Sequence, residues 1–285
     1  MRSAFLITLF CWAWFLSGPS AWAAGRARPQ KETQLNRPLV VGFVDSGLAY
    51  HLPRFAPYLG NEVGMDVDRG ASDVSDDVGH GTGVVDQFLS ETERLALSGF
   101  EIRMAKLTEP IHIESAIEYL VSQNVSIISM SMSFFPQSQA EFKRYQAAVK
   151  KLNQSTLFVI SAGDERVNLN KLKLHSSELP LENVLVVGGV VDLLGRQVIG
   201  QSNYGRPVDL MGLLSNLQIL TPDGEWQSGR GISYIVPKVS AHALAVQQLQ
   251  GIRSPEKIIK SLKKGSLSIR SDGDPSIKIK IFQSL

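Results

Sequence analysis

Ser233 lies between a glycine-containing turn and an apolar stretch, where a hydroxyl can serve as a nucleophile. Gly229 and Gly231 allow a tight backbone approach before it, and Pro237 suits the first turn of a helix. A serine at the start of a helix meets free backbone N–H donors and the positive end of the helix dipole, which favours nucleophilic chemistry. The alternative is that Ser233 only caps a core helix over residues 238–249.

Asp45 follows an apolar stretch, residues 38–44, that predicts a buried strand. A carboxylate at the carboxyl end of a central strand lies over the crevice where α/β sheets bind ligands. The alternative is that Asp45 caps the turn formed with Ser46 and Gly47.

His80 stands at the start of a second predicted helix, between Gly79 and Gly81. Neighbours with almost no side chain leave the imidazole open on one side. Because no second histidine or cysteine lies near it in the sequence, His80 lacks the partners of a metal site.

The rest of the chain alternates strands with helices, which predicts an α/β fold with a parallel sheet. Right-handed connections would bring the strand ends carrying Asp45 and Asp164 to the same side of that sheet. The alternation in residues 129–133 suggests a strand exposed on one side, as at an edge. We predict strands at residues 100–107, 125–134, 156–161 and 183–190, and helices at residues 113–123 and 142–152.

Five aspartates fall within twelve residues of a polar loop: Asp66, Asp68, Asp73, Asp76 and Asp77. So many carboxylates make a calcium site conceivable, but their spacing differs from that of an EF-hand loop. A solvated loop is the favoured interpretation.

Composition limits the function classes that fit the chain. With 285 residues, 44% of them hydrophobic, the chain can bury one large core, and we expect a single domain over residues 38–285 after a short polar segment at 25–37. The 29 basic and 27 acidic residues are spread along the sequence, so the basic stripe that nucleic acid requires is missing.

The first 24 residues have the features of a secretory signal peptide. Arg2 precedes an apolar run, residues 5–16, and small residues allow cleavage after Ala23 or Ala24. The alternative is an uncleaved anchor, although the run is short for a membrane span. Cys11, the only cysteine, lies in this segment, so the mature protein would have no disulfide, thiol nucleophile or cysteine metal site.

Short motifs, in order along the chain, together resemble the subtilisin-like serine protease family (subtilases, peptidase S8). They are Asp45-Ser-Gly47, His80-Gly-Thr-Gly-Val84, Ile127-Ile-Ser-Met-Ser-Met-Ser133, Ser161-Ala-Gly-Asp164, Ser202-Asn-Tyr-Gly205 with Asp209, and Gly231-Ile-Ser-Tyr-Ile-Val-Pro237. The chain order aspartate, histidine, serine is the one known for subtilisin.

The resemblance implies a role for each matching residue. Ser233 would be the nucleophile, His80 the general base that later protonates the leaving amine, and Asp45 the group that orients the imidazolium. Serine needs such a base because its hydroxyl is a poor nucleophile at neutral pH.

The same resemblance makes residues 127–133 the substrate-binding strand, with Ser131, Met132 and Ser133 as its substrate-binding residues. Ser133 replaces a family glycine and would crowd the first subsite. The glycine-rich loop of the opposite wall is reduced to residues 108–112. With fewer backbone partners for an extended substrate, we expect loose subsite selectivity and poor turnover of short peptides.

Asp164 matches the oxyanion position, where the family normally has an asparagine that donates a hydrogen bond. An aspartate is known there in a branch of the wider family. Asp164 would donate as a neutral acid, or else it marks a dead site.

The sequence departs from the family pattern at three further places. Gly83 stands where a second histidine is usual, residues 211–213 replace a family Ala-Pro-Gly, and the loop insertion after His80 that binds calcium in some members is missing. About twenty residues between the expected cleavage site and Asp45 are too few for a pro-domain that folds alone.

Together these features predict a secreted or periplasmic serine endopeptidase with a three-layer αβα fold, monomeric and acting on polypeptides. We expect no metal or cofactor, no nucleic-acid partner and no membrane contact after signal cleavage. The alternative is a subtilase-shaped protein that has lost catalysis and binds polypeptides or a partner protease. A third hypothesis is an esterase or another serine hydrolase, but the Gly-x-Ser-x-Gly motif that carries the nucleophile in that group does not surround Ser233.

Overall fold

The computed structural model describes residues 38–133, 155–171, 182–191, 202–214, 216–270 and 278–282. The predicted helix at residues 142–152 lies outside these ranges. The described helices are α1 (His80–Arg94), α2 (Ile113–Ser122), α4 (Val236–Gln250) and α5 (Pro255–Lys264). The strands are β1 (Leu39–Asp45), β2 (Leu59–Asp66), β3 (Phe100–Lys106), β4 (Ile127–Ser133), β5 (Leu157–Ser161), β6 (Val184–Val190), β7 (Leu210–Leu213), β8 (Leu217–Leu220), β9 (Trp226–Gly229), β10 (Leu267–Arg270) and β11 (Lys278–Ile281).

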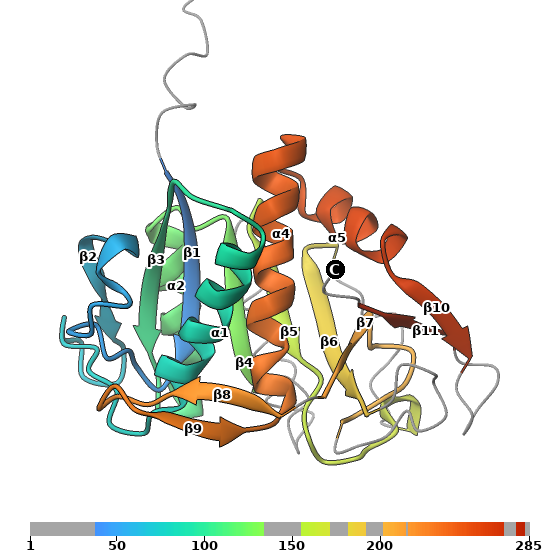
Figure 1. The fold of residues 1–285 in the computed structure, drawn as a ribbon, viewed down its shortest axis with the longest axis horizontal. Coiled ribbons are helices and arrows are strands. Elements are labelled where there is room, and N and C mark those ends of the chain that lie inside the picture. The colour runs from blue at the N-terminus through green and yellow to red at the C-terminus, as the bar shows by residue number, and fades with distance from the viewer. Residues whose placement is uncertain are drawn as a thin grey trace, which may run out of the picture. The chain divides into compact units, whose positions relative to one another are not determined.

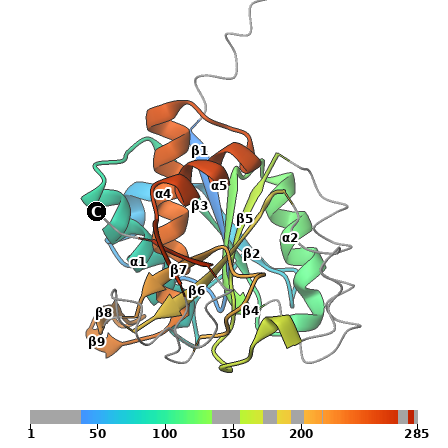
Figure 2. The ribbon, with the colours of Figure 1, turned by 90° about the vertical axis from the view of Figure 1, so that its right-hand side faces the viewer.

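Nine strands form one sheet in the order β10-β11-β7-β6-β5-β4-β1-β3-β2. All neighbouring pairs are parallel except β10 with β11. Helices α1, α4 and α5 cover one face and α2 covers the other (Figures 1 and 2). The fold is therefore the three-layer α/β arrangement that the sequence predicts.

The side chains of β1 explain why the sheet is covered on both faces. Val41 and Phe43 join the core cluster that includes residues of α1 and α4, whereas Val44 joins the cluster built on α2. Since successive residues of a strand point to opposite faces, a strand buried on both sides becomes an unbroken apolar run. The run at residues 38–44 is such a strand.

The interpretation of residues 129–133 as an edge was wrong. β4 pairs with β1 on one side and β5 on the other, so it is central. Ser129 and Ser131 are buried. The Ser131 hydroxyl donates to a backbone carbonyl of the segment before α4, so it marks a polar contact within the protein and not solvent exposure.

Glu91 joins α1 to α4 through a buried charge cluster. It accepts hydrogen bonds from Arg94 of its own helix and lies 2.7 Å from Nε2 of His242 in α4. Burial alone would raise the pKa of Glu91, but the bonds from His242 and Arg94 lower it to about 2. The cluster fixes the helix that begins at His80 against the helix that follows Ser233.

We expect Glu91→Gln to lower the free energy of unfolding by roughly 2 kcal/mol at neutral pH, allowing for solvent screening. A pKa lowered by folding contributes stability above the unfolded value, 4.5, and loses it as the pH falls through about 2. The difference from the wild type should therefore shrink between these pH values in denaturant titrations. Glu118→Gln, an exposed change on α2, is the control and should have little effect. A pH-independent difference would contradict the assignment.

Candidate active site

Asp45 and His80 meet at the carboxyl end of β1. Asp45 ends the strand and is only 4% exposed, and His80 begins α1. His80 Nδ1 lies 2.7 Å from Asp45 Oδ1, which also accepts the Ser46 N–H at 2.8 Å. Asp45 thus caps its own turn and also binds the imidazole. With Nδ1 facing the carboxylate, Nε2 is left to exchange a proton.

The surroundings of His80 raise its pKa above the ordinary value. Burial alone would lower this pKa, but the hydrogen bond to Asp45 and the negative charges of Asp45, Asp76 and, when ionised, Asp164 outweigh it. An imidazole must be neutral to accept a proton, so these charges move the pH range in which His80 can accept one to higher values.

Ser233 lies in a 3₁₀ turn, Ile232–Tyr234, immediately before α4. The cap position of α4 is Ile235, which makes no side-chain capping bond, so the interpretation of Ser233 as its N-cap is wrong. The ring of the adjacent Tyr234 has its centroid 5.7 Å from that of His80. The turn that carries Ser233 therefore places the ring of its next residue beside the imidazole of His80.

Reciprocal hydrogen bonds hold the serine turn to the end of β4. Ser131 Oγ donates to the Ser233 carbonyl at 2.7 Å, and Ser233 Oγ donates to the Ser131 carbonyl at 3.3 Å. Within the described residues no hydrogen bond joins Ser233 to His80; catalytic hydrogen bonds are often long or poorly aligned in proteins without substrate. Met132 is half-buried and Ser133 ends β4, and crowding of a subsite by Ser133 stays a prediction.

Asp164 follows β5, so it leaves the sheet at the same edge as Asp45. The residue is exposed overall, yet partial desolvation by neighbouring atoms raises its pKa, the charge of Glu165 raises it further, and His80 lowers it. A carboxyl that keeps its proton can donate a hydrogen bond, whereas a carboxylate cannot.

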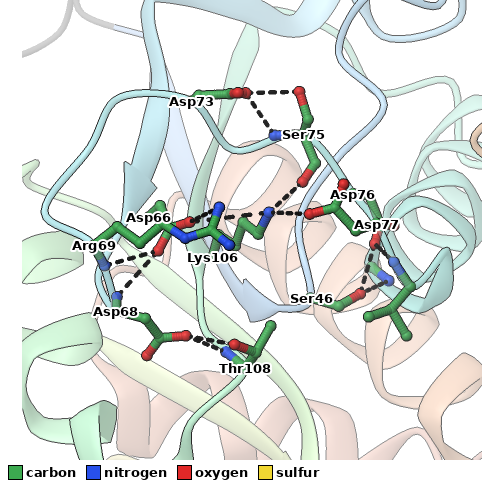
Figure 3. Close-up of polar contacts among 12 residues, drawn as sticks. Ser46, Asp66, Asp68, Arg69, Asp73, Ser75, Asp76, Asp77, Lys106 and Thr108 are labelled. Atoms are coloured by element: carbon green, nitrogen blue, oxygen red, sulfur yellow. Dashed lines mark hydrogen bonds and ion pairs between the residues drawn. The ribbon is translucent and has the colours of Figure 1, made fainter.

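The acidic loop is not simply solvated, contrary to the favoured interpretation. Asp66 and Asp76 are buried, and Figure 3 shows the carboxylates bound to backbone and side-chain donors of the loop and its neighbours. Lys106, at the end of β3, places its Nζ 3.0 Å from Asp77 Oδ2 and 2.6 Å from the Ser75 carbonyl. An ammonium group from the protein therefore neutralises part of this loop.

Asp76 ties the aspartate turn to the histidine helix, a role that the sequence interpretation missed. Its Oδ1 accepts from Ser46 Oγ at 2.9 Å and from the Gly79 N–H at 2.8 Å. Its Oδ2 accepts from the Thr82 N–H at 2.8 Å and from the Thr82 hydroxyl at 2.6 Å. Burial alone would raise the pKa of Asp76, but the bonds from Thr82, Gly79 and Ser46 hold it below its ordinary value. Asp76 is therefore a carboxylate that positions His80.

Asp68 holds the shortened wall of the predicted cleft. Its Oδ2 accepts from the N–H and hydroxyl of Thr108, both at 2.7 Å, and its Oδ1 lies 2.8 Å from His112 Nδ1. This carboxylate fixes residues 108–112 close to the end of β3.

Gly83 is a glycine because the β8–β9 hairpin leaves no room for a side chain. A Cβ at this position would come within 2.3 Å of Ile219 Cγ2 in β8, and a Cβ at Gly229 in β9 would meet the same side chain. A second histidine at position 83 would therefore displace the hairpin.

The described residues show neither a metal cluster nor a membrane span. No group of three or more histidine, cysteine, aspartate or glutamate residues in these ranges could hold a metal ion. Among the described helices, none is both long and apolar enough to cross a membrane.

The sequence matches the Subtilase family over residues 36–271, and the chain belongs to this family of serine proteases. Similar solved structures include a lanthipeptide protease, with 19% identity, a TM-score of 0.71 and coverage of 86% of this chain and 85% of that one. The nisin leader peptidase NisP from Lactococcus lactis has 19% identity, a TM-score of 0.66 and coverage of 88% and 87%. A cold-adapted subtilisin-like serine proteinase has 20% identity, a TM-score of 0.66 and coverage of 86% and 89%. No curated protein matches the chain.

We expect Asp76→Asn to lower kcat by roughly 10- to 100-fold, because small misplacements of a catalytic group cost about that much. The new amide would present a donor to Thr82 in place of an acceptor. Loss of a negative charge near His80 should also move the acid limb of the rate profile to lower pH. Measuring kcat and KM against pH tests both effects.

Asp77→Asn is the matched control, because Asp77 is the exposed neighbour that binds Lys106 and not the helix start. It should leave the acid limb in place. An unshifted acid limb in Asp76→Asn would mean that Asp76 supports only the fold.

Proposed function

We propose that this chain is an exported serine endopeptidase that cleaves polypeptides through Asp45, His80 and Ser233. The observation that carries the proposal is the 2.7 Å contact between Asp45 Oδ1 and His80 Nδ1, beside a serine turn that two hydrogen bonds fasten to β4. An oriented base next to a serine hydroxyl is the arrangement that nucleophilic acyl transfer requires.

In the proposed reaction, His80 Nε2 takes the proton of Ser233 as the serine oxygen attacks the scissile carbonyl. The C–N bond then breaks, His80 gives that proton to the leaving amine, and the acyl group stays on Ser233 as an ester. A water molecule, deprotonated by His80, hydrolyses this ester and restores the serine. Asp45 stabilises the imidazolium in both halves of the reaction.

Asp164 would complete the site by donating a hydrogen bond to the oxyanion. The raised pKa of its carboxyl supports this role, because the group must be neutral to donate. Each oxyanion donor of this kind contributes roughly 10²–10³ in kcat.

Export and a polypeptide substrate are parts of the same proposal. The signal-like residues 1–24 support export, to the periplasm or the medium. Two similar structures are, by their names, a protease of lanthipeptides and a leader peptidase, which favours a peptide substrate here.

A second candidate is a subtilase-shaped binding protein without catalysis. The observation that favours it is the aspartate at position 164, since an ionised carboxylate would repel an oxyanion. The two candidates differ in whether Ser233 reacts.

We expect a fluorophosphonate probe to label the purified protein at Ser233, because the probe reacts with serines activated by a base. Labelling should vanish in Ser233→Ala and fall sharply in His80→Ala. Peptide mapping by mass spectrometry identifies the modified residue. Ser131→Ala is a second variant for comparison. It keeps Asp45, His80 and Ser233 but removes the hydrogen bond from the Ser131 hydroxyl to the Ser233 carbonyl. Labelling that persists in Ser233→Ala would refute the assignment.

If Asp164 donates as a neutral acid, kcat should decline as the pH rises through the pKa of Asp164. We expect Asp164→Asn to remove this decline and to leave activity equal or higher. The asparagine amide donates at every pH, whereas Asp164 donates only below its pKa. The rise of activity as His80 loses its proton should remain. Rate profiles with an unfolded protein substrate measure both limbs. If Asp164→Asn abolishes turnover while its circular dichroism stays native, the carboxyl has another role.

A further inference from the structure

Tyr234, the residue after Ser233, has its ring against the imidazole of His80. The centroids of the two rings lie 5.7 Å apart, and the ring planes are tilted by 40°. Aromatic pairs interact at centroid distances of about 4.5–7 Å, so this is the spacing of an interacting pair. The contact joins the serine turn directly to the first residue of α1, a link that the Asp45–His80 hydrogen bond does not provide.

The ring of Tyr234 is held at both of its ends. At the backbone end, the Tyr234 N–H donates to the Gly231 carbonyl at 3.3 Å, within the 3₁₀ turn. At the hydroxyl end, a Cβ at Gly83 of α1 would lie 3.4 Å from Cε1, and a Cβ at Gly229 of β9 would lie 3.5 Å from Cε2. The ring therefore fits between the helix and the hairpin, where neither glycine has a side chain to displace it.

His80 needs a second contact because one hydrogen bond does not fix the orientation of its ring. Asp45 Oδ1 lies 2.7 Å from Nδ1, and the side chain of His80 is 35% exposed. A side chain that is held at one atom can still turn about its own single bonds. Such a turn would carry Nε2, which exchanges the proton in the proposed reaction, away from Ser233.

We propose that Tyr234 positions His80: its ring blocks rotation of the imidazole and keeps Nε2 directed at Ser233. This inference rests on the proposed function. Tyr234 is a positioning residue and takes no proton in the reaction. Burial and the negative charges of Asp45 and Asp76 raise the pKa of its phenol, so the ring stays uncharged beside the imidazole. Tyr234 therefore acts through the contact and shape of its ring.

Tyr234→Ala tests the inference because it removes the ring. We expect kcat to fall roughly 10- to 100-fold with little change in KM, since a misplaced base slows the chemical step more than it weakens substrate binding. Tyr234→Phe keeps the ring and should recover most of the lost rate. Unchanged kcat in Tyr234→Ala would overturn the inference. An equal loss in Tyr234→Phe would overturn it too, because the hydroxyl would then be the group that acts.

Tyr58→Ala is the matched control for loss of packing. Tyr58 is also partly buried against the core cluster that Tyr234 contacts, and its ring stacks on Phe100 at 5.1 Å. Its removal should lower stability and leave kcat in place, so equal losses of kcat in the two alanine variants would refute a positioning role. Tyr234→Leu, which keeps an apolar side chain without an aromatic ring, replaces Tyr234→Ala if that variant does not fold.

Proton NMR of the same proteins gives a readout that does not need turnover. The hydrogen-bonded proton between His80 Nδ1 and Asp45, identified by its loss in His80→Ala, should exchange faster with water in Tyr234→Ala. Its signal should therefore broaden in that variant and stay sharp in Tyr234→Phe. An equally sharp signal in Tyr234→Ala would overturn the inference, whatever the activity. A broadened signal, with a wild type that no fluorophosphonate labels, would support the contact and reject the proposed function.

Discussion

Parallel pairing of β1, β4 and β5 is the constraint on which the site depends. Parallel strands deliver their carboxyl ends to one edge of the sheet, so Asp45, Ser131 and the segment after Ser161 reach the same edge without further adjustment. Packing of α1 and α4 on one face then brings His80 and Ser233 to that edge from the other layer. The strand order and the helix packing therefore determine where these residues lie, and the hydrogen bonds of the loops adjust their positions.

The elements with strong periodicity were predictable from the sequence, and the weakly patterned ones were not. Strands β1, β5 and β6 are buried apolar runs, β3 alternates apolar residues with Glu101 and Arg103, and α2 carries an apolar stripe. All of these patterns are local in the sequence. β2 contains Gly60 and Gly64 and shifts register against β3, and its partly exposed side chains give no alternation. The β8–β9 hairpin has four-residue strands, too short for a periodic signal.

The residues of the candidate site also divide into those with a local sequence pattern and those that only the fold brings together. Short motifs predict Asp45, His80 and Ser233 as the catalytic residues, because their neighbours in the sequence carry the pattern, and the structure places Asp45 against His80. Asp76 was assigned to a solvated loop, since its bond to Ser46 spans 30 positions and only the fold brings the two together. Asn203 and Glu165, 38 positions apart, are a second long-range pair of this kind. Local motifs can therefore indicate candidate reactive residues, but not the distant residues that hold them in place.

The proposed mechanism needs a histidine that has lost its proton next to an aspartic acid that has kept its own. In the proposed mechanism, His80 must be neutral to take the proton of Ser233, and Asp164 must be neutral to donate to the oxyanion. The carboxylates of Asp45 and Asp76 raise the pKa of His80, which moves the start of activity to higher pH. Asp164 must therefore keep its proton to still higher pH if the active form is to be the dominant one.

His80 itself opposes that requirement. Its positive charge lowers the pKa of Asp164, so protonation of the imidazole favours loss of the second proton. Desolvation of Asp164 and the charge of Glu165 act against this pull. In the proposed mechanism, a carboxyl at position 164 is therefore compatible with catalysis only while it keeps its proton.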